Sequence, residues 1–260
     1  MINLFNVIIY IIAGLGAGLG TGLAGLSAAA VISPMLITFC GFKAYEAVGV
    51  ALASDVLASA ISAYTYGKNK KLDIKNGLVI LAAVVLFTVL SSFLASLVPN
   101  TAMGNFSIFT TFFLGIKFII KPVMTEKNKI DSKSTCEKII QSVLCGAVIG
   151  LICGFIGAGG GMMMLLILTS VLGYELKTAV GTSVFIMTFT ALTGAVSHFV
   201  IDGMPDFGAL LVCIIATFLG ARIAAVFANK ATAKTLNRAT GIVLAVLGAA
   251  MIIVTLIQKL

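Results

Sequence analysis

The sequence predicts an all-α integral membrane protein made of two repeats with opposite orientations. Three observations predict this class: the apolar composition, the length of the apolar runs and a glycine pattern that recurs at a fixed spacing. Sixty per cent of the 260 residues are apolar and ten per cent are charged, whereas about a quarter of the residues of a soluble domain are charged. The chain therefore has too little polar surface for a water-soluble domain.

The apolar runs have the length that a membrane-spanning helix needs. About 20 helical residues cross the ~30 Å hydrocarbon core, and the runs lack the alternation of transmembrane barrel strands. Two runs, 4–40 and 139–172, are too long for a single span and are interrupted by glycine. The runs with single-span length cover residues 44–66, 77–98, 101–120, 176–200, 207–228 and 236–258.

A gap-free shift that places Gly14 on Gly146 superimposes the two long runs. Because several further matches keep this one register, the pattern indicates an internal repeat. We predict an N-terminal repeat over 1–122, a cytoplasmic polar linker over 123–138 and a C-terminal repeat over 139–260. The other matched pairs are Gly18 and Gly150, Gly22 and Gly154, Gly25 and Gly157, Gly41 and Gly173, and the tripeptides Ala-Val-Gly at 47–49 and 179–181.

The positions of the basic residues predict the orientation of the chain. Lysine and arginine collect in cytoplasmic loops, and they are concentrated at 67–76, 121–138 and 229–238, whereas 98–101 and 201–206 have none. With the basic loops inside, each long glycine-rich run must enter and leave on one side of the membrane. Each repeat is then a glycine-broken helical hairpin followed by three transmembrane helices, and the two repeats are inverted.

This topology places both termini outside a cell membrane and accounts for the net charge of +8, so we predict no nucleic-acid partner. Inverted repeats with interrupted helices are typical of secondary transporters. A helix that begins inside the bilayer points unpaired N–H groups and its positive end at its tip, where an anion binds well. The sequence therefore predicts a transporter of a small anion, working by alternating access.

The predicted substrate-binding residues lie at the two glycine-rich breaks and just after the matched tripeptides. Thr182 and Ser183 extend the second Ala-Val-Gly tripeptide, and Arg222 is a candidate anion clamp; its alternative is an arginine that reaches the membrane interface. For the glycines the alternative is close helix packing. The residues at the breaks are Gly25, Ser27, Ala28, Gly157, Gly159, Gly160 and Gly161.

Two residues are candidates for coupling transport to protons. Asp55 lies in the middle of the run 44–66 with no charged residue within eight positions, and an ionisable group at that depth indicates function. It would take up a proton or pair with a cation, with Arg222 as the candidate partner. His198 is a candidate proton relay. The alternatives are a structural hydrogen bond for Asp55 and an interfacial position for His198.

The sequence predicts no enzyme, no cofactor and no metal site. The five cysteines are scattered without a metal-ligand spacing, and the methionines at 162–164 are expected to pack in the core. No nucleophile, base and orienting group occur in a recognisable pattern.

Both halves resemble the TauE/SafE sulfite exporter family over almost the whole chain. The resemblance is carried by the glycine-rich segments 150–161 and 22–29, by Pro34 and by the two Ala-Val-Gly tripeptides. In the first half Ser27-Ala28-Ala29 replaces the triple glycine of the second. The resemblance implies movement of sulfite, an organosulfonate or a related sulfur-containing or carboxylate anion. A passive anion channel, a transporter of another solute coupled to protons or cations, and an intramembrane enzyme or assembly factor are the alternatives.

Overall fold

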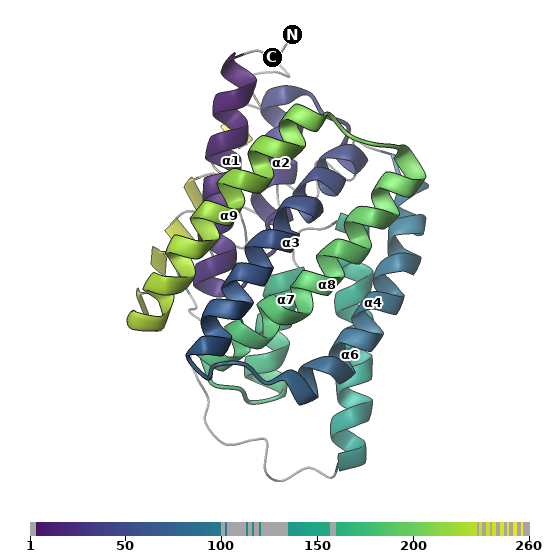
Figure 1. Cartoon of the computed structure of the whole chain (residues 1–260). Coiled ribbons are helices and arrows are strands. Elements are labelled where there is room, and N and C mark those ends of the chain that lie inside the picture. Colours follow the sequence, from purple (N-terminus) through teal and green to yellow (C-terminus); the bar gives the residue numbers. More distant parts are fainter. Residues whose placement is uncertain are drawn as a thin grey trace.

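The computed structural model describes residues 4–99, 135–156 and 160–232, with scattered residues between 102 and 120 and between 234 and 256. The predicted spans 101–120 and 236–258 therefore lie largely outside the described residues. The first half contains α1 (Leu4–Ala24), α2 (Ala29–Cys40), α3 (Ala44–Lys68) and α4 (Ile74–Ser96). The second half contains α6 (Thr135–Ile156), α7 (Gly160–Leu166), the π-helix η1 (Ile167–Val171), α8 (Leu176–Asp202) and α9 (Phe207–Lys230) (Figure 1).

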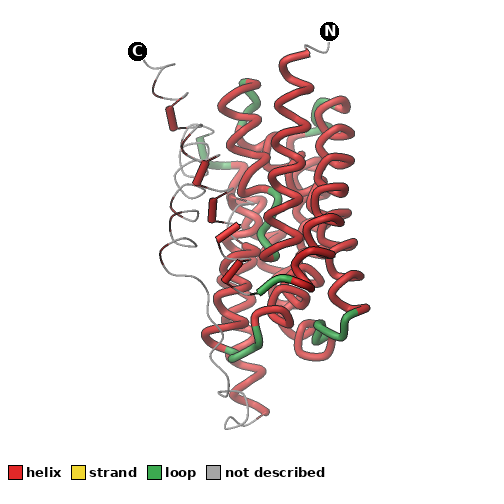
Figure 2. The backbone as a smooth tube through the Cα atoms, turned by 90° about the vertical axis from the view of Figure 1, so that its left-hand side faces the viewer, coloured by secondary structure: helices red, strands yellow, loops and turns green. Residues whose placement is uncertain are grey.

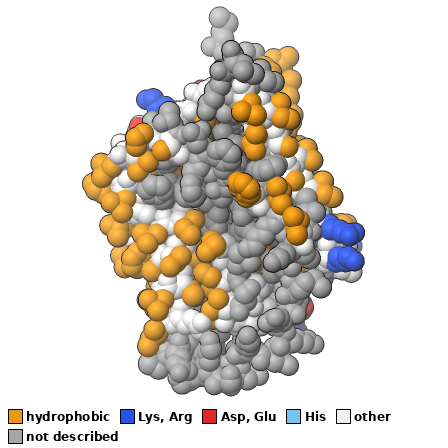
Figure 3. Space-filling model, turned by 180° about the vertical axis from the view of Figure 1, so that it is seen from behind, with side chains coloured by type: hydrophobic (Ala, Val, Ile, Leu, Met, Phe, Trp, Pro, Cys, Tyr) orange, Lys and Arg blue, Asp and Glu red, His pale blue; other side chains and the backbone are white. Residues whose placement is uncertain are grey.

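Over these residues the protein is a bundle of helices, as the composition predicts. The helices α1, α3, α4, α8 and α9 are each long and apolar enough to cross a membrane. Large apolar side chains such as Leu86, Phe93 and Val200 are exposed on the outside of the bundle. Orange apolar side chains cover the described part of the face in Figure 3, and charged side chains lie at its margins. An apolar exterior of this extent fits lipid rather than water as the surrounding solvent.

The first long glycine-rich run is broken, as the sequence predicts. The chain leaves the helix between α1 and α2, where Gly25 has a positive φ of 63°. In the second run α6 ends at Ile156 and α7 begins at Gly160, and residues 157–159 lie outside the described residues. Loop segments consequently occur at mid-height of the bundle as well as at its ends (Figure 2). After the first break the chain turns back: the ring of Phe42, beyond the end of α2, packs against Tyr10 near the start of α1.

Small residues let α1 pack closely on α9 and α6 pack closely on α4. Gly14, Gly18 and Gly22 on α1 face α9, and a Cβ on Gly14 would lie 2.6 Å from that of Ala216. The glycines at 146, 150 and 154 on α6 face α4 in the same way, where a Cβ on the first would lie 2.8 Å from that of Ala83. Ala83 on α4 thus corresponds to Ala216 on α9. The other positions of α4 and α9 that contact these glycines are separated by the same number of residues along the chain.

The helix ends repeat as well. Asp73 and Asp206 precede α4 and α9, and each carboxylate accepts a hydrogen bond from the backbone N–H three residues later, at 3.2 and 2.6 Å. This is the usual way in which aspartate starts a helix. Gly41 and Gly173, which follow α2 and η1, both have a positive φ, 70° and 71°. The same local signals therefore produce the same helix boundaries in both halves.

Candidate functional site

The first helix break lies at the centre of the bundle and contacts elements of both halves. The hydroxyl of Ser183 on α8 donates a hydrogen bond to the carbonyl oxygen of Gly25, at 3.1 Å. Gly161, at the start of α7, packs directly on the backbone of residues 25–27, and a Cβ added to it would lie 2.6 Å from the nitrogen of Ser27. The start of α7 therefore touches the break between α1 and α2, and only a residue without a side chain fits there.

The break exposes the amino-terminal tip of α2 to the interior of the protein. Ser27 is 2% exposed and Ala28 is fully buried. The Ser27 hydroxyl accepts the N–H of Ala29 at 3.3 Å, which satisfies one of the unpaired N–H groups of the first turn. The tip retains the positive end of the helix dipole.

The carboxylate of Asp55 lies at this tip. Its Oδ1 accepts hydrogen bonds from the Ser59 hydroxyl at 2.9 Å and from the Thr21 hydroxyl at 3.4 Å. The Ser27 side chain and the Ala28 backbone are its other polar neighbours. Asp55 is completely buried, and its Oδ2 has no hydrogen-bond partner. The helix tip that the sequence predicted for a substrate anion thus already faces an acidic side chain of the protein.

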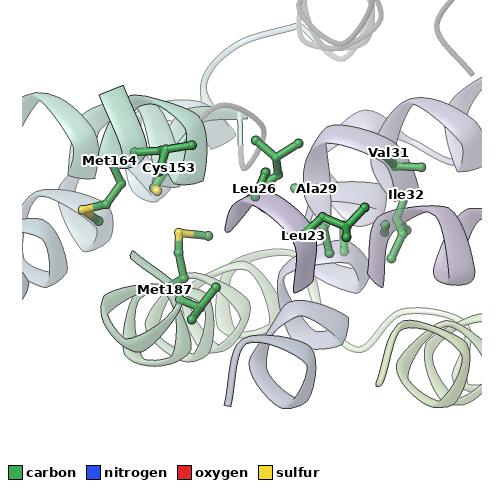
Figure 4. Packing of buried hydrophobic residues seen from close by; sticks show 14 of the residues in the cluster. Leu23, Leu26, Ala29, Val31, Ile32, Cys153, Met164 and Met187 are labelled. Carbon is green, nitrogen blue, oxygen red and sulfur yellow. The ribbon is translucent and has the colours of Figure 1, made fainter. Parts of the chain in front are cut away.

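Apolar, sulfur-containing side chains from the second half lie beside the break. Cys153 of α6, Met164 of α7 and Met187 of α8 are buried, and Figure 4 shows Cys153 and Met187 directed toward each other, with Leu26 beside them. Met187 is the residue that the shift relating the two halves places on Asp55. At these equivalent positions near the centre, the first half therefore supplies an acidic side chain and the second half an apolar thioether.

His198 lies away from the first break and contacts the end of α6. Its Nδ1 is 3.1 Å from the carbonyl oxygen of Tyr45, its Nε2 is 3.3 Å from that of Gly154, and its ring stacks on the Tyr45 ring at 4.0 Å between centroids. Tyr66 occupies the equivalent position in the first half, and its hydroxyl donates to the carbonyl oxygen of Gly22 at 3.1 Å. Both ring side chains therefore contact the last turn of the helix that precedes a break.

Of the remaining predicted site residues, Arg222 is exposed on α9 and does not pair with Asp55. Gly160 begins α7, whereas Gly157 and Gly159 lie outside the described residues. The structure thus brings together Gly25, Ser27, Ala28, Gly161, Ser183 and Asp55.

Thr182 belongs to a different group of contacts, which joins the loop before α4 to the loop before α8. We call this group the loop latch; it consists of Lys71, Asp73, Tyr174, Glu175 and Thr182. Lys71 forms an ion pair with Glu175 at 3.0 Å, the Tyr174 hydroxyl donates to Asp73 Oδ2 at 2.7 Å, and the N–H of Asp73 donates to the Thr182 hydroxyl at 3.1 Å. The latch connects the two halves at one end of the bundle.

The latch contains perturbed ionisable groups that lie outside the predicted spans. Partial burial would raise the pKa of Asp73, but hydrogen bonds from Asn76 and Tyr174 outweigh it and hold the pKa below its usual value. Burial, together with the same hydrogen bond, raises the pKa of Tyr174. At neutral pH the latch therefore joins an ionised carboxylate to a neutral phenol.

Sequence reasoning did not select Thr21 and Ser59 as site residues. Ser59 follows Asp55 by four positions, one helical turn, so a readable signal was present. Thr21 comes from α1, and nothing in the sequence spacing connects it to α3.

Comparisons with known proteins identify the family. A probable membrane transporter protein of Bacillus subtilis, YunE, is 25% identical over 95% of this chain and 97% of its own length. The probable membrane transporter protein MJ0441 of Methanocaldococcus jannaschii is 28% identical over 72% of this chain and 70% of its own length. Residues 10–251 match the family described as sulfite exporter TauE/SafE. Because this match covers most of the chain, the chain belongs to the TauE/SafE family of membrane transporters.

Proposed function

We propose that the protein is a secondary transporter that moves a small anion across the cell membrane by alternating access. One observation carries this proposal: Gly161 at the start of α7 packs on the broken backbone at 25–27, so the two interrupted helices meet. Non-helical backbone at membrane depth is tolerated where protein or a water-filled cavity covers it. The family suggests sulfite, an organosulfonate or a related sulfur-containing or carboxylate anion as the substrate.

The repeated packing supports two inverted halves as the moving parts. The seam between α1 and α9 and the seam between α6 and α4 use equivalent glycines and equivalent partner positions. Tyr66 and His198, which occupy equivalent positions in the two halves, contact the equivalent carbonyl groups of Gly22 and Gly154. Rocking of one such repeat against the other is the usual route to alternating access.

The substrate site lies at the tip of α2, with Gly25, Ser27, Ala28, Gly161 and Ser183 as its residues. An ionised Asp55 at the same tip repels a second negative charge, and a buried carboxylate without a counter-charge is costly. The substrate anion therefore binds after Asp55 has been neutralised, by a proton or by another cation. This order of events would couple anion movement to a cation gradient.

Counterflow in proteoliposomes tests the proposed function. Vesicles are loaded with unlabelled sulfite, and the uptake of external radiolabelled sulfite is followed. A carrier produces transient accumulation of label above equilibrium, because the two fluxes share one site. A passive channel equilibrates the label without overshoot, and such a result would reject the carrier; taurine and acetate serve as competing sulfonate and carboxylate probes.

The role of Asp55 is tested in the same vesicles with Asp55→Asn. The variant removes the charge at nearly constant volume, so sulfite uptake should lose its dependence on an imposed pH or cation gradient. An unchanged dependence would exclude Asp55 as the coupling group.

A further inference from the structure

The surroundings of Asp55 consist of oxygen-bearing groups from three elements. Ser59 on α3 donates to Oδ1 at 2.9 Å. The Thr21 hydroxyl on α1 lies 3.4 Å from the same oxygen and also bonds the Ala17 carbonyl oxygen of its own helix at 3.1 Å. Ser27 in the break is a further polar neighbour. Thr21, Asp55 and Ser59 are fully buried, and Oδ2 lacks a hydrogen-bond partner. A carboxylate oxygen in this position is open to a ligand that accepts its lone pairs.

Ser59 differs from the neighbouring serines of α3. Ser54 and Ser62 each donate to the carbonyl oxygen four residues earlier, at 2.8 Å, which is the usual bond of serine inside a helix. For Ser59 the residue four positions earlier is Asp55, and the hydroxyl binds the carboxylate side chain instead. Its oxygen therefore lies beside the carboxylate, at the centre of the bundle.

The charge of Asp55 is not balanced by a basic side chain among the residues that the structure describes. Arg222, the partner that the sequence suggested, is exposed, and the ion pair seen in the described part of the chain joins Lys71 to Glu175. The tip of α2 supplies only about half a positive charge. An ionised carboxylate at this depth therefore calls for a cation from outside the chain.

The donor set indicates which kind of cation. A proton needs only a single carboxylate oxygen. Here the hydroxyls of Thr21, Ser27 and Ser59 also surround the carboxylate. The last turn of α1 ends at the same break. Hard metal ions prefer oxygen ligands such as carboxylates, carbonyls and water, and hydroxyl oxygens are hard donors of the same kind. In other transporters, interrupted helices hold sodium with unwound backbone carbonyls and helix ends. One carboxylate balances a single positive charge. In the described ranges no group of three His, Cys, Asp or Glu residues comes together to bind a divalent metal. The site therefore favours a monovalent cation.

We propose that Thr21, Ser27, Asp55 and Ser59 form a sodium-binding site between α1, α3 and the tip of α2. Bound sodium neutralises Asp55 and leaves the helix tip available to the substrate anion. The role in anion coupling rests on the proposed function, whereas sodium binding itself does not and is measurable without substrate. The site makes the transporter a sodium–anion symporter.

Thermal unfolding of the purified full-length protein in detergent tests the site. The midpoint is followed at fixed pH and ionic strength while choline chloride is replaced by sodium chloride. The wild-type midpoint should rise saturably with sodium. Ser59→Ala should weaken the apparent sodium affinity about tenfold or more, because groups that hold a metal's carboxylate ligand commonly contribute that much. Thr21→Val should act in the same direction.

Ser62→Ala is the matched control, since Ser62 is equally buried on α3 but bonds only its own helix. It should keep the wild-type sodium response. The site is rejected if sodium acts no differently from choline on the folded wild-type protein, or if Ser62→Ala and Ser59→Ala weaken the response equally. If the wild-type midpoint depends on pH, if Ser59→Ala changes that dependence, and if sodium has no effect, the site binds a proton and the sodium proposal is rejected. Loss of sulfite counterflow with sodium binding intact would contradict the proposed function alone.

Discussion

Gly18 and Gly20 lie two residues apart on α1 but have different surroundings. A Cβ on Gly18 would overlap the carbonyl oxygen of Thr217 and lie 2.7 Å from the nitrogen of Ala221, whereas a Cβ on Gly20 would meet nothing closer than a Leu26 methyl group at 3.5 Å. The backbone of α9 cannot move away as a flexible side chain can. The difference is therefore one of packing, not of intrinsic helix preference.

We predict that Gly18→Ala destabilises the protein by about 1–3 kcal/mol, the usual cost of overpacking. Gly20→Ala should be neutral or stabilising by up to about 1 kcal/mol, because alanine favours the helix. The midpoints of thermal unfolding in detergent, measured side by side, check the pair. Equal midpoints for the two variants would mean that α1 and α9 are not in close contact.

His198 offers a second prediction at this scale. His198→Phe retains a ring to stack on Tyr45 but removes both nitrogens, so the carbonyl groups of Tyr45 and Gly154 lose their contacts. An unsatisfied buried polar group costs about 1–3 kcal/mol, and thermal unfolding should detect that loss. Sulfite transport should keep its pH dependence, because the contacts described for His198 are to backbone carbonyls and the Tyr45 ring. A shifted pH profile would instead support the proton relay that the sequence suggested.

At the scale of elements, the loop latch joins the segment before α4 to the segment before α8. Its contacts are polar and partly exposed: the side chains of Lys71 and Glu175 are 34% and 51% exposed. Exposed ion pairs contribute little on their own. The hydrogen bond from Tyr174 to Asp73, the shortest of these contacts, is therefore the better target.

We predict that Tyr174→Phe lowers stability by about 1 kcal/mol at neutral pH, since this contact is only partly buried and solvent reaches Asp73. The folded-state pKa of Asp73 is lowered, so its contribution is present above the unfolded pKa of about 3.9 and is lost as pH falls through the folded pKa. The difference between wild type and variant should accordingly disappear in acid. Unfolding midpoints from pH 8 down to about pH 2, below the lowered pKa of Asp73, check this. A difference that persists at the acid end would assign the loss to packing.

Tyr64→Phe is the control for this measurement, because Tyr64 is 68% exposed on α3. Its midpoint should follow the wild type at every pH. A loss equal to that of Tyr174→Phe would show that the effect does not depend on the latch.

At the scale of the whole molecule, the loops that join the long spanning helices fall at two opposite ends of the bundle. The latch brings the segments at 71–73 and 174–175 together at one end. At the other, the N–H of Asp206 contacts the Glu46 carboxylate at 3.4 Å. The basic loop 67–76 and the lysine-free connection 201–206 therefore belong to different ends, as the charge pattern requires.

We predict that Lys68→Cys and Met204→Cys, each in a variant without the native cysteines, react with a membrane-impermeant thiol reagent from opposite sides. Lys68→Cys should be protected in intact cells and Met204→Cys should be labelled, because basic loops remain in the cytoplasm. Labelling of both before lysis would contradict the predicted orientation, and labelling of only Lys68→Cys would reverse it. Lysed cells provide the control for reactivity.

The sequence by itself determined the membrane class, the approximate helix boundaries and the break at Gly25. These depend on local properties: the length of apolar runs, Asp73 and Asp206 as helix starts, and glycine where the backbone turns at Gly25. It also pointed to Asp55, because an isolated acid in an apolar run is costly wherever the helix packs.

The tertiary structure alone decided what surrounds Asp55. It brought Thr21 from another helix, placed the α2 tip beside the carboxylate, and left Arg222 exposed on α9. It also assigned Thr182 to the latch and its neighbour Ser183 to the break. The physical reason is that adjacent residues on a helix point about 100° apart, so their partners depend on which helices pack against each face.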